Sequence, residues 1–544
     1  MKEFLKRELY SFRAVAAILA RWLLLAVPTG LVCGAVGTAF HLAVEHVTEW
    51  RAEHIWLLWL LPAAGLAIVA LYKITGCEGM GTNNVIRAVH SGESVSPLLV
   101  PAIFFGTVLT HLCGGSAGRE GAALQMGGSI GYNIAKLFRF SDHDRRTATA
   151  CGMAAFFSAL FGTPLSATLF GIMVEDVGLA FSVAFVPGFA AALIAYGVSL
   201  ACGISPTHFA LTAPALSIDS TLLVAVLGVA CALVARAFCW LLHTMEHEMP
   251  RRLPNPWVRA VVGGAAVVAL SYLMGVGRYN GAGMGVITAA VEQGQALPWD
   301  FICKMLLTAL TLSAGFKGGE VVPSFYIGAT FGCAFGPLLG LPAGFSAAVG
   351  LVSVFCGATN TLIPSILLAY ELFGGVGLEL IALGCGVCYM LSGTHGLYSS
   401  QLFVTEKLLS EYTESWGSGC TTDPLSFSSA QPLIFLRPVL QSSVASSCDA
   451  PCAQVFCRRC VKIKCPKTMM RTNQSPVLHA AERAAVRKDA LQAACHVPDF
   501  YHRRVQRRTS AGCARYSTAS GVQQHAIRVE PWNAVGFFQR RFIP

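Results

Sequence analysis

The sequence predicts an all-α protein that crosses a membrane many times and is built from two similar halves. Of its 544 residues, 54% are hydrophobic and 12% are charged, which lies outside the range of soluble domains. Apolar segments follow one another from about residue 15 to residue 392, and motifs of the first half return in the second. A chain of this composition must satisfy its backbone polar groups internally, so a polytopic helical protein is expected.

The first 14 residues are expected to form a separate amphipathic helix on the cytoplasmic membrane surface. Lys2, Lys6, Arg7 and Arg13 alternate there with apolar side chains, as in helices that lie in the interface. The positive-inside rule then places the N-terminus in the cytoplasm, and no cleavable signal is evident.

Many apolar segments are interrupted by glycine or proline before they reach the roughly 20 residues of a simple span. The interruptions at residues 26–30, 162–164 and 340–342 each combine both residue types. Broken helices at membrane depth are tolerated where they are buried in protein or line a cavity. The pattern therefore favours a transporter or a channel.

The chain repeats one plan about 200 residues later. Glu120 and Glu320 each follow a glycine turn and precede an apolar helix. The matching motifs, in order, are residues 79–81 and 283–285, 118–120 and 318–320, and 151–154 and 356–359. Repeats in transporters commonly place the substrate at their interface near the midplane, with helix N-termini directed at an anion. The glycine turns before Met80, Glu120 and Val321 are the expected positions of those N-termini.

The chain therefore divides into an N-terminal helix (1–14), two membrane repeats (15–205 and 206–410) and a tail (411–544). From residue 416 onward, 18 Lys and Arg stand against 6 Asp and Glu, with many Ser and Cys. We expect this tail to be disordered and cytoplasmic. Its Cys457 and Cys460 have a zinc-like spacing, but the second pair of a zinc site is missing, so no metal is expected. The remaining chain is nearly neutral, which argues against a nucleic-acid partner.

The glycine-rich stretch of residues 114–131 places charge at membrane depth. Arg119 and Glu120 lie within it, between apolar segments of membrane length. A carboxylate there costs roughly 2.5–3.5 kcal/mol and usually marks an ion or proton path. Glycine lets the backbone approach a ligand, and a helix that begins at the turn directs its positive end at an anion. The stretch predicts an anion site that contains a titratable side chain.

These residues resemble the CLC family of chloride channels and anion/proton antiporters, over about residues 15–410. The Gly-Arg-Glu-Gly signature of the family is matched by residues 118–121, its Gly-Ile-Phe-Ala-Pro signature by residues 319–323, and its tyrosine by Tyr398. The resemblance implies the CLC-type fold of two inverted-topology repeats with short, tilted and broken helices. It also implies a homodimer in the lipid bilayer, with one pathway in each subunit.

Two departures from the chloride-selective members resemble the fluoride-exporting branch of the family. Met80 stands where those members have a serine, and Glu320 stands where they have an apolar residue. A hydroxyl donates a hydrogen bond to an anion and a thioether cannot, so Met80 changes how the ion is held. The resemblance implies a fluoride/proton antiporter of a bacterial cytoplasmic membrane.

The resemblance also assigns roles to individual residues. Glu120 is the gate and proton carrier, and Glu320 is a second carboxylate that faces it across the repeat interface. When ionised, Glu120 occupies the anion site; when protonated, it leaves, and this competition couples protons to anions. The expected anion contacts are Met80, Gly81, Thr82, Asn83, Gly118, Arg119, Gly121, Val321, Val322 and Tyr398.

Alternatives stay open for several residues. Glu120 could instead be paired permanently with Arg119, and Glu320 could cap the following helix. Glu175 fits a surface ion pair as well as an inner proton carrier. Three further motifs are interpreted as structural: His111 as a buried imidazole, Glu371 as a scaffold carboxylate, and His243-x-x-Glu246-His247 as a helix end.

Alternatives also stay open for the function. A chloride/proton antiporter or a passive, voltage-gated type of chloride channel would fit the same fold, and a channel would also keep a gating glutamate. A membrane receptor that binds an anion without moving it is a further candidate. No nucleophile triad and no phosphate-binding loop is recognisable, so neither an enzyme nor a cofactor is expected.

Overall fold

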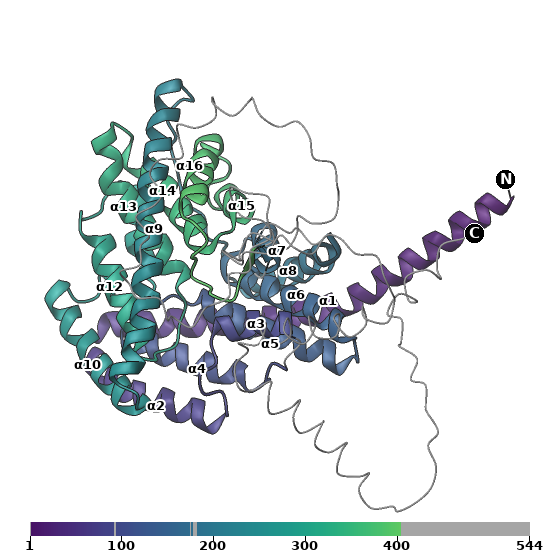
Figure 1. Ribbon diagram of the computed structural model, residues 1–544, viewed down its shortest axis with the longest axis horizontal. Coiled ribbons are helices and arrows are strands. Elements are labelled where there is room, and N and C mark those ends of the chain that lie inside the picture. Colours follow the sequence, from purple (N-terminus) through teal and green to yellow (C-terminus); the bar gives the residue numbers. More distant parts are fainter. Residues whose placement is uncertain (1, 92–93, 175, 178–181, 404–544) are drawn as a thin grey trace, which may run out of the picture. The chain divides into compact units, whose positions relative to one another are not determined.

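The computed structural model describes residues 2–91, 94–174, 176–177 and 182–403 (Figure 1). The predicted tail of residues 411–544 and Glu175 lie outside these ranges. Within them the regular secondary structure is helical except for one short parallel pair of strands, β1 (Asp176–Val177) with β2 (Leu402–Phe403). The all-α prediction is confirmed.

The two halves repeat each other helix by helix. The first contains α1 (Lys2–Glu53), η1 (Ile55–Leu60), α2 (Leu61–Ile74), α3 (Thr82–Ser91), α4 (Leu99–Leu112), α5 (Glu120–Leu137), α6 (Asp142–Phe161), α7 (Pro164–Met173) and α8 (Ser182–Ala201). The second contains α9 (Ile218–Arg252), α10 (Pro256–Met274), α11 (Met284–Glu292), α12 (Asp300–Ser313), α13 (Val321–Phe335), η2 (Gly336–Leu339), α14 (Ala343–Thr359), α15 (Leu362–Phe373) and α16 (Leu378–Leu391). Each half opens with its longest helix, and the boundary placed at residues 205–206 falls in the connection between α8 and α9.

The halves meet at a backbone bridge between Gly118 and Gly319. Gly118 N–H donates to the Gly319 carbonyl at 2.6 Å, and Gly319 N–H donates to the Gly118 carbonyl at 2.7 Å. The two bonds are reciprocal, as expected where an approximate two-fold axis relates two repeats and a residue on the axis meets its own counterpart. Gly118 therefore corresponds to Gly319. Helices α5 and α13 likewise begin 201 residues apart. The counterpart of Glu320 is therefore Arg119, and the sequence comparison that set Glu320 against Glu120 is wrong by one residue.

Small residues allow the helices of each half to cross closely. A Cβ added to Gly127 on α5 would overlap the carbonyl of Gly152 on α6, and one added to Gly328 on α13 would overlap the carbonyl of Gly350 on α14. Close backbone approach at small residues is a main source of helix association in lipid. These equivalent contacts match Gly152 with Gly350, whereas the sequence comparison matched it with Gly357.

One of the three expected helix breaks does not occur. Helix α1 runs without interruption from Lys2 to Glu53, through Pro28, so residues 2–14 are not a separate helix. The small residue at position 30 serves packing instead, because a Cβ on Gly30 would lie 2.7 Å from the Ala191 carbonyl of α8. The position of residues 2–14 on the membrane surface stays a prediction.

The other two breaks are present. Helix α6 ends at Phe161, followed by the C-cap Gly162 with a φ of 70°, and α7 begins at Pro164. Gly340, with a φ of 89°, follows η2, and α14 begins at Ala343. Glycine adopts this left-handed conformation at little cost, and proline ends or begins helices because its ring fixes φ.

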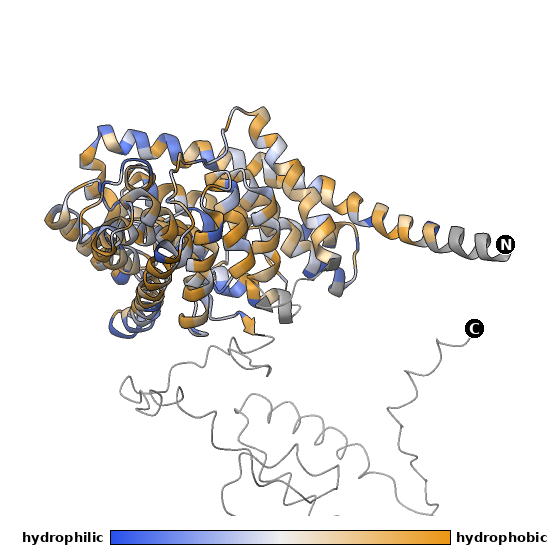
Figure 2. Ribbon diagram, turned by 90° about the horizontal axis from the view of Figure 1, so that it is seen from above, coloured by the Kyte–Doolittle hydropathy of each residue, from blue (hydrophilic) through white to orange (hydrophobic). Residues whose placement is uncertain are grey.

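Six of the described helices are long and apolar enough to cross a membrane, and five further apolar helices have only 10–17 residues. Hydrophobic residues dominate most of the helical ribbon, and hydrophilic ones gather mainly at helix ends and connections (Figure 2). The apolar window of the span Val321–Leu339 is 78% buried, whereas that of α1 is 22% buried. Helix α13 therefore lies inside the protein, and α1 exposes its apolar surface.

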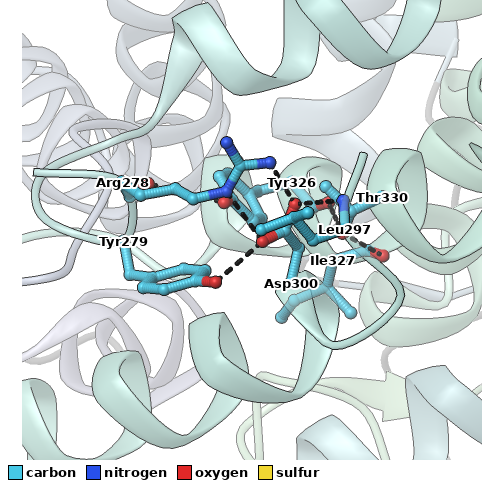
Figure 3. A network of polar contacts seen from close by, with 7 residues as sticks. All are labelled: Arg278, Tyr279, Leu297, Asp300, Tyr326, Ile327 and Thr330. Atoms are coloured by element: carbon cyan, nitrogen blue, oxygen red, sulfur yellow. Dashed lines mark hydrogen bonds and ion pairs between the residues drawn. The ribbon is translucent and has the colours of Figure 1, made fainter. Parts of the chain in front are cut away.

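A buried carboxylate fastens the α10–α11 connection to α12 (Figure 3). Asp300 is fully buried and accepts hydrogen bonds at 2.8 Å from Arg278 Nε, the Tyr279 hydroxyl and Leu297 N. Tyr326 of α13 joins the cluster through its hydroxyl, 3.4 Å from the Arg278 carbonyl. A buried charge is stable only when it is paired and hydrogen-bonded, and this network supplies both. Through Tyr326 the network also stabilises α13, whose first turn belongs to the site described below.

The glycine crossings lead to a prediction about stability. Gly328→Ala should lower the free energy of unfolding by about 1–3 kcal/mol, because the added methyl group overpacks the α13–α14 contact. The measurement is thermal or denaturant unfolding of the purified protein in detergent.

The matched control is Gly386→Ala on α16, where an added Cβ would meet no atom within 4 Å. This variant should be neutral or slightly stabilising, since alanine favours a helix over glycine. Equal effects of the two substitutions would contradict the proposed importance of the crossing.

Candidate functional site

Two helix N-termini meet at the bridge between the repeats, and a third begins beside the second turn of α5. Helices α3, α5 and α13 begin at Thr82, Glu120 and Val321, at or within two residues of the positions that the glycine turns predicted. Gln125 of α5 donates to the Thr82 hydroxyl of α3 at 3.0 Å, and the bridge described above joins α5 to α13. The first N–H groups of a helix lack intrahelical acceptors and carry partial positive charge. Their convergence creates a region suited to an anion.

The Glu120 carboxylate lies in this region. The side chain is fully buried, and its Oε2 accepts a hydrogen bond from Arg119 N at 2.8 Å. It also lies close to the backbone N–H of Val322 in the first turn of α13. A Cβ on Gly118 would stand 2.5 Å from Oε2, so only glycine leaves room for the carboxylate in this position. Glu120 thus contacts the N-termini of both central helices.

The pairing of Glu120 with Arg119 is present but long. Arg119 Nε lies 3.5 Å from Glu120 Oε1, and this oxygen has no hydrogen-bond partner among the described residues. At 3.5 Å the contact is an ion pair and not a good hydrogen bond. Arg119 also lies within electrostatic range of Glu45 on α1. The arginine therefore balances the charge of Glu120 without satisfying both of its oxygens.

Glu320 lies on the other side of the bridge. It precedes the first residue of α13 and is nearly buried, but its side chain does not cap the helix. The interpretation of Glu320 as a helix cap is therefore wrong. A Cβ on Gly121 would stand 2.9 Å from Glu320 Oε2, which places this oxygen directly against the residue after Glu120. Two carboxylates thus flank one pair of glycine turns.

Tyr398 supplies a buried hydroxyl with no hydrogen-bond partner among the described residues. It lies within electrostatic range of both Glu320 and Glu120, without a hydrogen bond of good geometry to either. Its loop is held by Leu397 N, which donates to the Ala358 carbonyl at 2.7 Å, and by Gln401 Nε2, which donates to the Thr359 carbonyl at 2.8 Å. A fixed, unsatisfied donor beside two carboxylates is suited to an anionic ligand.

Polar groups hold the loop that precedes α3 and the first residues of this helix, residues 79–84. Gly81 N–H donates to the Asn84 side chain at 3.0 Å, and the Asn83 side-chain oxygen accepts from Ser400 N at 3.4 Å. Together with the Thr82–Gln125 contact, these bonds tie α3 to α5 and to the tyrosine loop. Of the anion contacts expected here, the Gly81 N–H is therefore already donated to a protein acceptor, whereas the Thr82 and Asn83 oxygens only accept hydrogen bonds, which leaves the donor groups of both side chains outside these contacts. Met80 is partly buried and packs against the main apolar cluster.

Of two residues outside the centre, Glu371 behaves as the sequence indicated and His111 does so only in part. Glu371 of α15 accepts hydrogen bonds at 3.0 Å from Leu165 N and Ser166 N, so it caps α7 of the other repeat and is structural. His111 is buried, with Nδ1 2.9 Å from the Thr107 carbonyl, but its Nε2 has no partner among the described residues. The expected imidazole is therefore only half satisfied.

Sequence reasoning missed two buried charged residues of α12. Asp300 and Lys304 are fully buried on successive turns of α12, and Lys304 Nζ donates to the Gly281 carbonyl at 2.6 Å. Two opposite charges four residues apart in an apolar segment are the signal that would have found them.

The sequence of this chain is similar to that of a known family. Residues 64–393, more than half of the chain, match the profile of the family described as Voltage gated chloride channel. This chain belongs to the CLC family. The family consists of channels and transporters, so the CLC assignment makes the chain a multi-pass membrane protein of that kind.

Individual CLC relatives agree with the family assignment. A chloride/fluoride channel protein of Pseudomonas syringae pv. tomato is 37% identical and aligns with 70% of this chain and 86% of its own length. An H⁺/Cl⁻ exchange transporter, ClcA, of Vibrio campbellii is 27% identical over 71% of this chain and 90% of its own.

Solved structures extend the likeness to the fold. One described as a CLC-type fluoride/proton antiporter superposes with a TM-score of 0.68, at 36% identity, over 71% of this chain and 98% of its own. A slow cyanobacterial Cl⁻/H⁺ antiporter has a TM-score of 0.60 at 20% identity, over 68% of this chain and 94% of its own, and at that identity supports the fold alone. The predicted CLC-type fold is confirmed.

Proposed function

We propose that this protein exports fluoride in exchange for protons across a bacterial cytoplasmic membrane. The observation that carries the proposal is the pair of buried carboxylates, Glu120 and Glu320, beside the unpartnered Tyr398 hydroxyl where helix N-termini converge. The similarity to a chloride/fluoride channel protein and to a fluoride/proton antiporter structure supports the choice of fluoride and protons. A homodimer with cytoplasmic termini is part of the same proposal.

Glu120 is the proposed gate. Its ionised carboxylate contacts backbone donors of two helix N-termini, so it acts as an anion tethered in the anion site. Protonation removes the negative charge and with it the attraction to these donors. The side chain then leaves, and a free anion takes its place. Because the anion and the ionised carboxylate exclude each other, protons and anions move in opposite directions.

The proposed fluoride preference depends on Met80 and Tyr398. Fluoride is a small acceptor that must exchange strong hydration for close donors, and a phenolic hydroxyl and backbone N–H groups provide such donors. The Met80 thioether provides none, so at position 80 the site offers an ion no hydroxyl. Chloride/proton exchange is the second candidate, since the Vibrio campbellii relative carries that name.

The proposal is tested by anion efflux from proteoliposomes, with a fluoride electrode and a pH electrode read together. Fluoride efflux should exceed chloride efflux and should be accompanied by proton uptake, since one site binds either the anion or the carboxylate. Greater chloride efflux would reject the selectivity, whereas fluoride efflux without proton uptake would identify a passive channel.

Glu120→Ala should leave fluoride movement but reduce proton uptake per fluoride by about tenfold or more, because the variant removes the group that carries the proton. The two electrodes measure this ratio directly. Glu49→Ala, which removes an exposed carboxylate of α1, is the control and should keep the ratio of the unmodified protein. Intact coupling in Glu120→Ala would show that another carboxylate carries the proton.

Met80→Ser should shift the preference from fluoride toward chloride by about tenfold, the value of one added hydrogen bond to an anion. The measurement is the ratio of the two efflux rates. Met284→Ser, at the start of α11 in the second repeat, changes a methionine in the same way and should leave the ratio unaltered. An equal shift in both variants would mean that the position of Met80 does not set selectivity.

A further inference from the structure

The two longest helices carry similar His–Glu pairs. On α1, His41 Nε2 lies 3.5 Å from Glu45 Oε2, and on α9, His243 Nδ1 lies 3.8 Å from Glu246 Oε2. Glu246 follows Glu45 by 201 residues, the separation that also relates Gly319 to Gly118. The two glutamates therefore occupy equivalent places in the two repeats, whereas His243 lies one residue beyond Leu242, the counterpart of His41.

Each pair lies within electrostatic range of one of the central turns. His41 and Glu45 are within electrostatic range of Arg119, the residue before Glu120. His243 and Glu246 are within electrostatic range of Glu320. The repeat thus sets one titratable pair next to each half of the site, although neither pair contacts the bridge itself.

The hydrogen bond of His243 determines how its ring is oriented. His243 Nε2 lies 2.7 Å from the carbonyl oxygen of Gly396, in the loop that carries Tyr398. A carbonyl can only accept a hydrogen bond, so Nε2 carries the hydrogen in the neutral ring. The lone pair of Nδ1 then faces Glu246, ready to accept a proton from that side.

Glu320, His243 and Glu246 form a row of titratable groups, and the exposed fraction of their side chains rises from the site outward. Glu320 is 9% exposed, the His243 side chain 32% and the Glu246 side chain 45%. Beyond them the end of α9 carries His247, Glu248, Arg251 and Arg252, and such a density of charge belongs in water and not in hydrocarbon. The row therefore connects a nearly buried carboxylate with the aqueous end of α9.

A partly buried cation lies near these groups. Lys317, in the connection between α12 and α13, is within electrostatic range of Glu246, and its Nζ lies 4.1 Å from the centre of the Tyr72 ring. The other charged groups close to His243 are Glu246 on its own helix and Glu320 before α13, and the loop contributes the Gly396 carbonyl. Both neighbouring side chains are carboxylates, which favour transient protonation of the imidazole between them.

We propose that His243 and Glu246 relay protons between water and Glu320. Glu246 takes a proton from water and passes it to His243 Nδ1. The resulting imidazolium then gives up the hydrogen bond of Nε2–H to the Gly396 carbonyl and releases this proton, through water, to the Glu320 carboxylate. Glu320 becomes a neutral acid, and His243 returns to a neutral ring with its hydrogen on Nδ1, which reorients before the next transfer. The inference rests on the proposed fluoride/proton exchange and names the residues by which protons reach the site.

A purely structural role for His243 is separable by the choice of variant. His243→Gln keeps an N–H donor for the Gly396 carbonyl but has no titratable group, so it preserves the loop contact and removes the relay. Glu246→Gln removes the outer carboxylate in the same way. His247→Gln is the matched control, because His247 is a neighbour on α9 whose ring contacts Glu248 at 3.7 Å and not the loop.

The experiment measures fluoride efflux and proton uptake in proteoliposomes of the full chain, and fluoride binding by calorimetry in detergent. His243→Gln and Glu246→Gln should slow proton uptake by about tenfold or more while fluoride affinity stays within about twofold, since only proton delivery is impaired. His247→Gln should match the unmodified protein in both measurements.

The failures are distinguishable. Proton uptake in His243→Gln equal to that of His247→Gln, with coupling intact in the unmodified protein, would overturn the relay and leave the proposed function standing. Loss of fluoride binding in His243→Gln would also overturn it, since the histidine would then be a structural part of the site. Fluoride efflux without proton uptake in the unmodified protein would overturn the proposed function and the relay together.

Discussion

Two backbone hydrogen bonds between Gly118 and Gly319 are the constraint on which the rest of the centre depends. They join the repeats at their axis and bring the first turns of α5 and α13 to the same place. Any side chain at these positions would meet neighbouring backbone or the Glu120 carboxylate. Glycine is required here because the chain segments approach too closely for a Cβ atom.

The bridge explains why charge is tolerated so deep in an apolar protein. Glu120 is fully buried, yet it lies where backbone N–H groups of two helices are unsatisfied and where Arg119 provides a positive charge. The desolvation of a carboxylate is offset only by donors and counter-charges of this kind. A site that stabilises a tethered carboxylate in this way has the same requirements as one that stabilises a free anion.

The repeats share a scaffold but not its chemistry. Arg119 and Glu320 are counterparts, and so are Glu120 and Val321, so the symmetric backbone carries an asymmetric set of charges. The scaffold contacts remain common to both halves, as the glycine crossings of α5 with α6 and of α13 with α14 show. Packing thus preserves the symmetry, whereas the functional side chains depart from it.

The sequence by itself determined the membrane-spanning helical class, the existence of two repeats and the residues of the central turn, because composition and glycine turns act locally. Only the tertiary structure decided which residues of the two repeats correspond. Two apolar, glycine-rich segments still look alike when one is shifted against the other by one residue or by several, whereas the Gly118–Gly319 bridge and the glycine crossings allow a single match. The tertiary structure also decided that α1 continues through Pro28 and that His243 lies against the Tyr398 loop. Contacts between residues more than 150 positions apart leave no trace in local pattern, because they form only when the helices pack.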